Sequence, residues 1–364
     1  MRASIGLAAV LLAAACGRSG AGESPEGGSV REPFDKVGYT HEGTGFDKVL
    51  AKAKELERAV AAIPPVVAGD GPVAAVVAPH DDYTYAARVA LHAFANLDAR
   101  EVVLVGVAHH AKDFPASEGK LLFDSFGAWH GPYGDVPISP LRADLLAALG
   151  SDDALVSDAM HAGEHSLEGL VPFVQNRVRG VRIVPVLVPY MSLARLTELA
   201  DRTGTALAGA MKKRGLKLGK DVAIVISSDM VHYGDTGWSG RSFADFGTDG
   251  AAYDTAVARD LALIRDHLEG PISPERLSAL YGALVKDDFH EYRISWCGRF
   301  SVPFGLATLR AAARSLGAPV PRGTLLNYGT TLDPGAVDYG VEGMGATGPA
   351  NLHHWVGFAA IVYH

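Results

Sequence analysis

Cysteine is scarce in this chain of 364 residues, which contains only Cys16 and Cys297. Cys16 ends an apolar N-terminal run, so Cys297 has no partner and the sequence predicts no disulfide within the folded protein. An odd thiol is either simply buried or a metal ligand, and both alternatives stay open at this point.

Positive charge is also limited. The chain has 33 Lys and Arg against 41 Asp and Glu, a net charge of −8, and no cluster of basic residues. Nucleic-acid binding requires a basic face that neutralises phosphates, so we expect no nucleic acid among the partners. Several enzyme motifs are missing: the Walker loop, a strand-linked Gly-x-Gly-x-x-Gly, the Gly-x-Ser-x-Gly elbow and His-Glu-x-x-His. These absences argue against nucleotide-binding enzymes, serine hydrolases and zinc proteases.

The first 16 residues have the pattern of an export signal. Arg2 is followed by a short apolar run over residues 5–15, which is too short to span a membrane. The run ends in Leu-Ala-Ala-Ala-Cys16, which resembles the lipobox of bacterial lipoproteins. We therefore predict an exported lipoprotein, lipidated at Cys16 and membrane-anchored, facing the periplasm or the cell exterior. A plain secretory signal with an incidental cysteine is the alternative.

Residues 17–32 are rich in Gly and Ser and predict a flexible tether. No linker-like segment interrupts residues 33–364, which predicts a single domain. Short apolar runs alternate with helical patterns, as in a helix over residues 193–214. We predict an α/β fold with a mainly parallel central sheet and helices on both faces.

Three apolar runs each end in groups that can do chemistry. His80 follows the first run, His109 and His110 end the second, and Asp229 and His232 follow the third. The carboxyl ends of parallel strands meet at one edge of a sheet, so one polar site is expected there. Adjacent strand residues face opposite ways, so only one histidine of the pair should face the site.

With Cys297, these residues offer imidazole, carboxylate and thiolate ligands. This mixture suits iron, copper or zinc better than magnesium or calcium, which prefer oxygen ligands. Strand-end histidines can also be structural and hydrogen-bond one another, so a metal-free scaffold remains an alternative.

Five segments, taken in order, resemble the Memo family, which includes the AmmeMemoRadiSam system protein B. They are APHDDYTY (78–85), VGVAHH (105–110), EHSLEGLVPF (164–173), VISSDMVHYG (225–234) and WCGR (296–299). The resemblance runs from about residue 73 to the C-terminus. It implies a fold like that of class III extradiol (LigB-like) dioxygenases and one bound iron or copper ion.

Residue by residue, the resemblance implies that His80, His109 and Cys297 are metal ligands. It implies that His232 is a catalytic acid or base, with Asp229 beside it fixing its tautomer. Other residues of the matched segments are implied as pocket residues or supports for the ligands: His110, His165, Glu168, Tyr83 and Tyr233.

The activity implied is that of an oxidoreductase acting on a small aromatic or phenolic molecule. The alternative is a non-catalytic module that sequesters metal, or binds a peptide or other ligand in the same cleft. One departure stands out: the family's His-Ala-Gly-Tyr is replaced here by His80-Asp81-Asp82-Tyr83. We expect these two acids to make the mouth of the pocket more negative.

Overall fold

The computed structural model describes residues 28–60 and 71–364. The predicted signal peptide, Cys16 and most of the predicted tether lie outside the described residues, so export and lipidation stay predictions. Within the described part, none of the helices combines the length and the apolar character needed to cross a bilayer.

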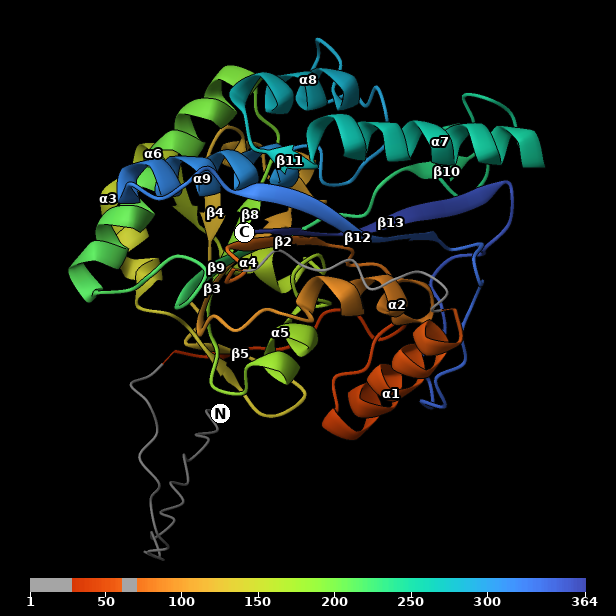
Figure 1. Ribbon diagram of the computed structural model, residues 1–364, viewed down its shortest axis with the longest axis horizontal. Coiled ribbons are helices and arrows are strands. Elements are labelled where there is room, and N and C mark those ends of the chain that lie inside the picture. The colour runs from red at the N-terminus through yellow and green to blue at the C-terminus, as the bar shows by residue number, and fades with distance from the viewer. Residues whose placement is uncertain (1–27, 61–70) are drawn as a thin grey trace, which may run out of the picture.

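A mixed sheet runs through the middle of the molecule (Figure 1). Its central strands are parallel and follow the order β2 (Ala75–Ala78), β9 (Val222–Ser227), β3 (Glu101–Val107) and β8 (Arg182–Val188). These are the apolar runs of the sequence, and their β-branched residues suit strands buried on both faces. The predicted α/β class with a parallel centre is confirmed.

Antiparallel strands extend the sheet at both edges. On one side β2 is followed by β13 (His354–Tyr363), β12 (Arg322–Thr330) and β11 (Gly270–Pro271), and β10 (His232–Gly234) also pairs with β13. On the other side β8 is followed by β4 (Leu121–Phe123) and β7 (Ala154–Val156). A small separate sheet contains β1 (Val30–Arg31), β5 (Ala128–Trp129) and β6 (Val136–Pro137).

Helices cover both faces of the sheet, as Figure 1 shows. One layer contains α3 (Leu141–Asp153), α6 (Leu193–Arg214), α7 (Gly250–His267), α8 (Pro274–Leu284) and α9 (Ser301–Leu316). The other contains α1 (Gly43–Val60), α2 (Tyr83–Phe94), α4 (Asp158–Ala162) and α5 (Val171–Arg177).

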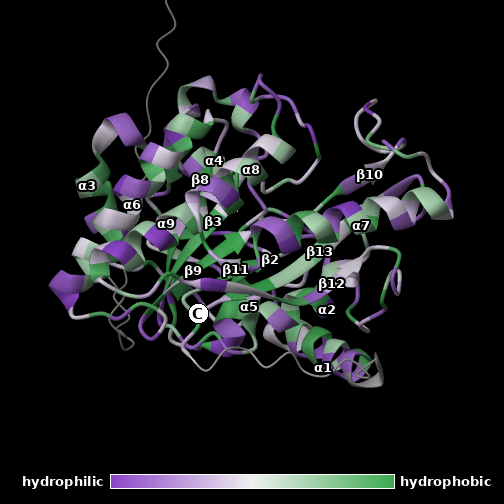
Figure 2. Cartoon of the chain, turned by 45° about the horizontal axis from the view of Figure 1, so that its top comes forward, coloured by the Kyte–Doolittle hydropathy of each residue, from purple (hydrophilic) through white to green (hydrophobic). Residues whose placement is uncertain are grey.

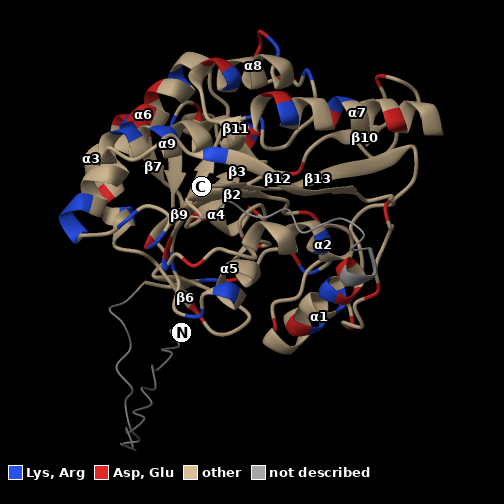
Figure 3. Cartoon of the chain, in the orientation of Figure 1, with Lys and Arg blue, Asp and Glu red and all other residues tan. Residues whose placement is uncertain are grey.

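Alternate residues of β3 supply these two cores: Val103 and Val105 pack into the first, and Val102 and Leu104 into the second. Figure 2 shows the hydrophobic colouring concentrated on the central strands. Figure 3 shows acidic and basic residues interspersed over the outer helices, while the strands carry few charges. The polar groups at the carboxyl ends of the central strands are therefore exceptions within an apolar interior.

Candidate metal centre

Three parallel strands end beside one another and place their next residues around one space. His80 lies two residues beyond β2, His109 two beyond β3 and Asp229 two beyond β9. Cys297 comes from the loop before α9. One ligand atom each of His80, His109 and Cys297 lies within 4.8 Å of the other two. The residues that the resemblance implies as ligands are thus brought together.

The His80 ring is held through its Nδ1 atom, which lies 2.7 Å from the Oγ of Ser227. The single hydrogen of that hydroxyl is donated to the carbonyl of Ser166, so Oγ accepts a hydrogen bond from Nδ1–H. The hydrogen therefore sits on Nδ1, and Nε2 keeps a free lone pair. This Nε2 atom lies 3.7 Å from the sulfur of Cys297.

His109 is oriented in the same way by a different partner. Its Nδ1 lies 2.8 Å from Glu164 Oε1, and its backbone N–H donates to Glu164 Oε2 at 2.7 Å. Burial raises the pKa of Glu164, but its electrostatic interaction with His109 and several hydrogen bonds outweigh this and lower it below its ordinary value. An ionised carboxylate only accepts, so Nδ1 carries the hydrogen and Nε2 stays free.

Cys297 is a buried thiol in electrostatically unfavourable surroundings. Burial, followed by the nearby charge of Asp229, raises its pKa well above the ordinary value. Its sulfur accepts the backbone N–H of Asp229 at 3.0 Å. At Gly298 a Cβ would lie 2.1 Å from Ser228 Oγ, so the loop can pass this close only with glycine. A bound cation would favour the thiolate form that the protein alone disfavours.

Two histidines that each have a free Nε2, and one thiol, therefore lie around a shared space. This donor set fits a soft or borderline transition-metal ion. A second group of candidate ligands, His109, Glu164 and His165, shares His109 with the first. The Glu164 oxygens, however, already accept hydrogen bonds from His109 and from the backbone N–H of Ser166.

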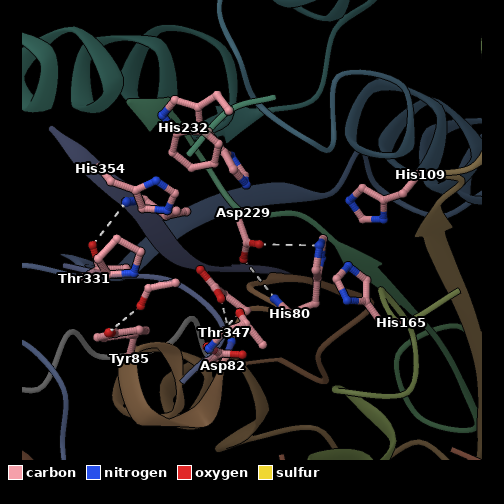
Figure 4. Close-up of a pocket in the computed structure, with 15 residues that line it drawn as sticks. His80, Asp82, Tyr85, His109, His165, Asp229, His232, Thr331, Thr347 and His354 are labelled. Atoms are coloured by element: carbon pink, nitrogen blue, oxygen red, sulfur yellow. Dashed lines mark hydrogen bonds and ion pairs between the residues drawn. The ribbon is translucent and has the colours of Figure 1, made fainter. Parts of the chain in front are cut away.

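Asp229 contacts His80 and not His232. Its Oδ1 accepts the backbone N–H of His80 at 3.0 Å, and its Oδ2 lies 3.4 Å from His80 Nε2 (Figure 4). Burial raises the pKa of Asp229 to about 7. The residue expected to fix the tautomer of His232 is thus engaged with the neighbouring histidine.

The backbone holds His232 instead. Its Nδ1 lies 3.3 Å from the carbonyl of Met230 and 3.2 Å from that of Ser295, so Nδ1 is the donor and Nε2 is free. Removal from water lowers the pKa of His232 to about 4, so the ring is neutral at pH 7. His232 lines the same cavity as His80 and Asp229.

The segment before α1 folds over the site and adds Asp35. Burial opposes protonation of His165, but its 2.8 Å hydrogen bond to Asp35 and the charge of Glu164 raise its pKa to about 9. Glu168 holds this segment in place by pairing with Arg31 and accepting the backbone N–H of Asp35 at 2.7 Å. Glu168 lines neither cavity of the site, whereas His165 lines both.

Two adjoining cavities open onto the candidate ligands. The smaller one, which we call the inner cavity because it reaches His80 and Asp229, has a volume of about 260 Å³. It is also bounded by His109, His232 and a stacked pair of rings, Trp238 and His354. These two rings are 3.9 Å apart and inclined by 8°. The outer one, of about 370 Å³, is lined by both His109 and His110.

Acidic side chains line both cavities. Asp81 and Asp82 border the inner and the outer cavity, and Asp35 and Glu164 border the outer one, without a Lys or Arg in the lining of either. Burial, then repulsion by Asp229 and Asp82, raises the pKa of Asp81 well above its ordinary value. Asp81 and Asp82 thus place two carboxyl groups in the lining beside the candidate ligands.

The two tyrosines expected near the pocket pack behind it. Tyr83 donates to the carbonyl of Gly169 at 2.8 Å, and Tyr233 stacks on Trp355 and donates to Gly247 at 3.0 Å. Sequence reasoning missed other residues of the site: Asp35, Glu164, Ser227, Trp238 and His354. Glu164 and Ser227 lie inside the quoted motifs and could have been found there.

Comparisons with known proteins agree with the motifs. A family model described as Memo-like protein matches residues 46–341. A MEMO1 family protein of Methanopyrus kandleri is 29% identical over 303 residues, 81% of this chain and 85% of that protein.

Two further MEMO1 family proteins match over shorter lengths. That of Caldivirga maquilingensis is 31% identical over 165 residues, 44% of this chain and 54% of the relative. That of Methanothermobacter thermautotrophicus is 30% identical over 171 residues, 46% of this chain and 57% of the relative. These two matches span only about half the length of the relatives, whereas the family model spans most of this chain. The chain belongs to the Memo-like protein family.

Proposed function

We propose that this Memo-like protein binds one redox-active metal ion, iron or copper, through His80, His109 and Cys297. One observation carries the proposal: both histidines are fixed through Nδ1, which leaves Nε2 of each unprotonated, and a ligand atom of each lies within 4.8 Å of the Cys297 sulfur. Hydrogen bonds that fix ligand tautomers in this way are typical supports of metal ligands in proteins. A metal-free scaffold would not require this arrangement.

We further propose that the protein is an oxidoreductase related to non-haem iron dioxygenases. A bound iron or copper ion would supply the redox chemistry and the Lewis acidity. His232 acts as the general base, because its neutral ring has a free Nε2 and lines the cavity in which a substrate would sit. Asp229, whose pKa is about 7, can hold or release a proton at the same place.

The inner cavity favours a small aromatic or phenolic substrate. Its volume of about 260 Å³ and the flat stacked pair of Trp238 and His354 suit a single ring. His232 lies edge-on to Trp238, with 5.4 Å between ring centroids. A phenolic hydroxyl on a ring stacked against Trp238 would therefore come near the proposed base.

Oxygen uptake with catechols as probes tests this activity. The chain loaded with Fe(II) is compared with His232→Gln and with His353→Gln, a control at an exposed histidine whose ring contacts Asp235 at the surface. Loss of a general base costs about 10²–10⁴-fold in rate, so we expect such a fall in His232→Gln at unchanged metal content. Equal rates in His232→Gln and wild type would contradict the assignment.

A second candidate function uses the same site without turnover. The carboxyl groups that line both cavities would suit a non-catalytic module that sequesters metal or binds a cationic ligand such as a basic peptide, whose charge would favour the ionised form that burial disfavours at Asp81. Full metal occupancy with no oxygen uptake on any phenol, together with binding of such a peptide, would support this function over the first.

Membrane anchoring belongs to the same proposal. The lipobox-like end of the N-terminal run supports lipidation at Cys16 of an exported protein, with residues 17–32 as its tether. Cys16→Ser should move the protein from the membrane fraction to the soluble fraction. Unchanged membrane association would contradict the anchor.

A further inference from the structure

A third, smaller recess touches the candidate metal centre. It has a volume of about 40 Å³ and is lined by His109 and Cys297 together with Arg299, Tyr292 and Tyr190. None of the carboxyl groups that line the two larger cavities borders this recess. Its charged side chain is the arginine.

Arg299 is buried and lacks a counter-ion. The residue is 2% exposed, and among the described residues no carboxylate lies within 4.0 Å of its guanidinium. Its Nε is buried without a hydrogen-bond partner, and its Nη2 has only a long 3.5 Å contact with the carbonyl of His290. A guanidinium has five N–H donors, so most of its hydrogen-bonding capacity is unused.

Aromatic rings cover part of this cation. The guanidinium carbon lies 3.5 Å from the ring centre of Tyr292, 4.9 Å from that of Phe300 and 5.3 Å from that of Tyr190. Ring faces attract the cation, and a hydrogen bond from Arg299 partly offsets the burial that raises the pKa of Tyr292, but Nε is still left without an acceptor. A buried charge with unsatisfied donors is unfavourable, and an anion beside the guanidinium would lower both costs.

The neighbouring thiol of Cys297 does not act as the missing partner of Arg299. The polar contacts of the Cys297 sulfur are with His80 Nε2 and with the backbone of Asp229. The N-terminal end of α9 also adjoins the recess, because Phe300 lines it and α9 begins at Ser301. The positive end of the helix dipole adds to the preference for negative charge.

We propose that the recess binds a small anion, a carboxylate or an inorganic oxyanion, against Arg299 and next to His109 and Cys297. About 10–15 Å³ of such volume holds one water-sized group, so 40 Å³ holds roughly three. Formate and the carboxylate end of a larger molecule have this size. A planar guanidinium binds such groups through two parallel hydrogen bonds. The recess is formed by the protein alone, so the proposal does not depend on the metal.

Calorimetric titration of the metal-free full chain with formate tests the proposal. We expect saturable binding, weakened at least tenfold in Arg299→Lys, which keeps the charge but loses the planar pair of donors. Arg293→Lys, at an exposed arginine in the same loop, should bind formate like wild type. No saturable binding to folded wild type, or equal binding in Arg299→Lys, would overturn the proposal.

A bromide soak and a competition with benzoate complete the test. If Arg299→Lys does not fold, wild-type crystals soaked in bromide should show an anomalous peak in contact with the guanidinium, and its absence would overturn the proposal. Benzoate identifies the source of the anion: displacement of formate by benzoate indicates a carboxylate carried on a ring, whereas formate binding unaffected by benzoate indicates a free small anion.

Discussion

Replacing Ser227 by alanine tests how the structure prepares His80 for a metal. Ser227 is fully buried, accepts a hydrogen bond from His80 Nδ1 and donates one to the carbonyl of Ser166. In Ser227→Ala the proton of His80 is no longer confined to Nδ1. The Nε2–H tautomer, which cannot ligate a metal through Nε2, then competes.

Ser227→Ala should lose both metal affinity and stability, each for its own reason. Removing an outer partner of a ligating histidine typically lowers metal affinity about 10–100-fold, which is about 1.4–2.7 kcal/mol. The buried carbonyl of Ser166 and the buried Nδ1–H each lose a partner, which costs about 1–3 kcal/mol of unfolding free energy per group. The variant should therefore be less stable and also bind metal more weakly.

Ser301→Ala separates these two effects. Ser301 is a buried serine whose hydroxyl donates to the backbone carbonyl of Ser227 at 2.9 Å, without a hydrogen bond to a candidate ligand. Competition with a chelator of known affinity, run anaerobically with Fe(II) and Cu(I), should show weaker binding in Ser227→Ala and wild-type binding in Ser301→Ala. Equal affinity in Ser227→Ala and wild type would refute the tautomer argument.

Three further predictions concern charge. Because the pKa of Cys297 is raised, the thiol is protonated before the metal binds, and binding releases its proton. The apparent metal affinity should therefore rise about tenfold per pH unit between pH 7 and 9 in chelator competition. An affinity that does not change with pH would contradict thiolate ligation. The pKa of Glu164 is lowered in the folded state, mainly by His109 once burial is overcome. The ionised carboxylate therefore stabilises the fold at pH values above its unfolded pKa near 4.5, and this stabilisation is lost on acidification. Denaturation of Glu164→Gln should show a deficit in unfolding free energy at pH 7 that shrinks toward pH 3. Arg31→Met leaves Glu168 buried without its cation, so unfolding free energy should fall by about 3–5 kcal/mol in urea titrations, and a loss below about 1 kcal/mol would contradict a structural role for the pair.

The central sheet could be predicted because its strands are continuous apolar runs. The run after Glu101 forms β3, and the helical pattern over residues 193–214 forms α6 with those same bounds. The edge strands β4 and β7 have three residues each, too few to give a periodic pattern, and their pairing partners are distant in sequence. The residues around them therefore show no pattern from which a strand could be predicted.

Local patterns misjudged two segments of the site. The pattern of residues 164–178 is typical of one continuous helix. In the structure residues 164–170 form turns and α5 begins only at Val171, because Glu164 and Ser166 bond to the end of β3. The alternation rule for His109 and His110 does not apply, since β3 ends at Val107 and both histidines follow in a turn. His109 meets the other candidate ligands, and the more exposed His110 still borders the outer cavity.

Other residues of the site could not be recognised from the sequence around them. Trp238 and His354 meet because β10 pairs with β13, and Asp35 reaches His165 because Arg31 and Glu168 hold its segment. Each contact joins residues more than one hundred positions apart. Such contacts depend on the completed fold, so motifs could indicate the ligands but not the walls of the cavity.

The metal content of the purified chain tests directly whether His80, His109 and Cys297 bind a metal ion. The full chain is prepared without a metal-affinity tag, reconstituted anaerobically with Fe(II) or Cu(I), and measured by mass spectrometry beside His80→Ala, Cys297→Ser and the surface control His353→Ala. We expect about one ion per chain in wild type and in the control, and loss of the ion in both site variants with folding retained. A folded wild type that takes up neither metal would contradict it.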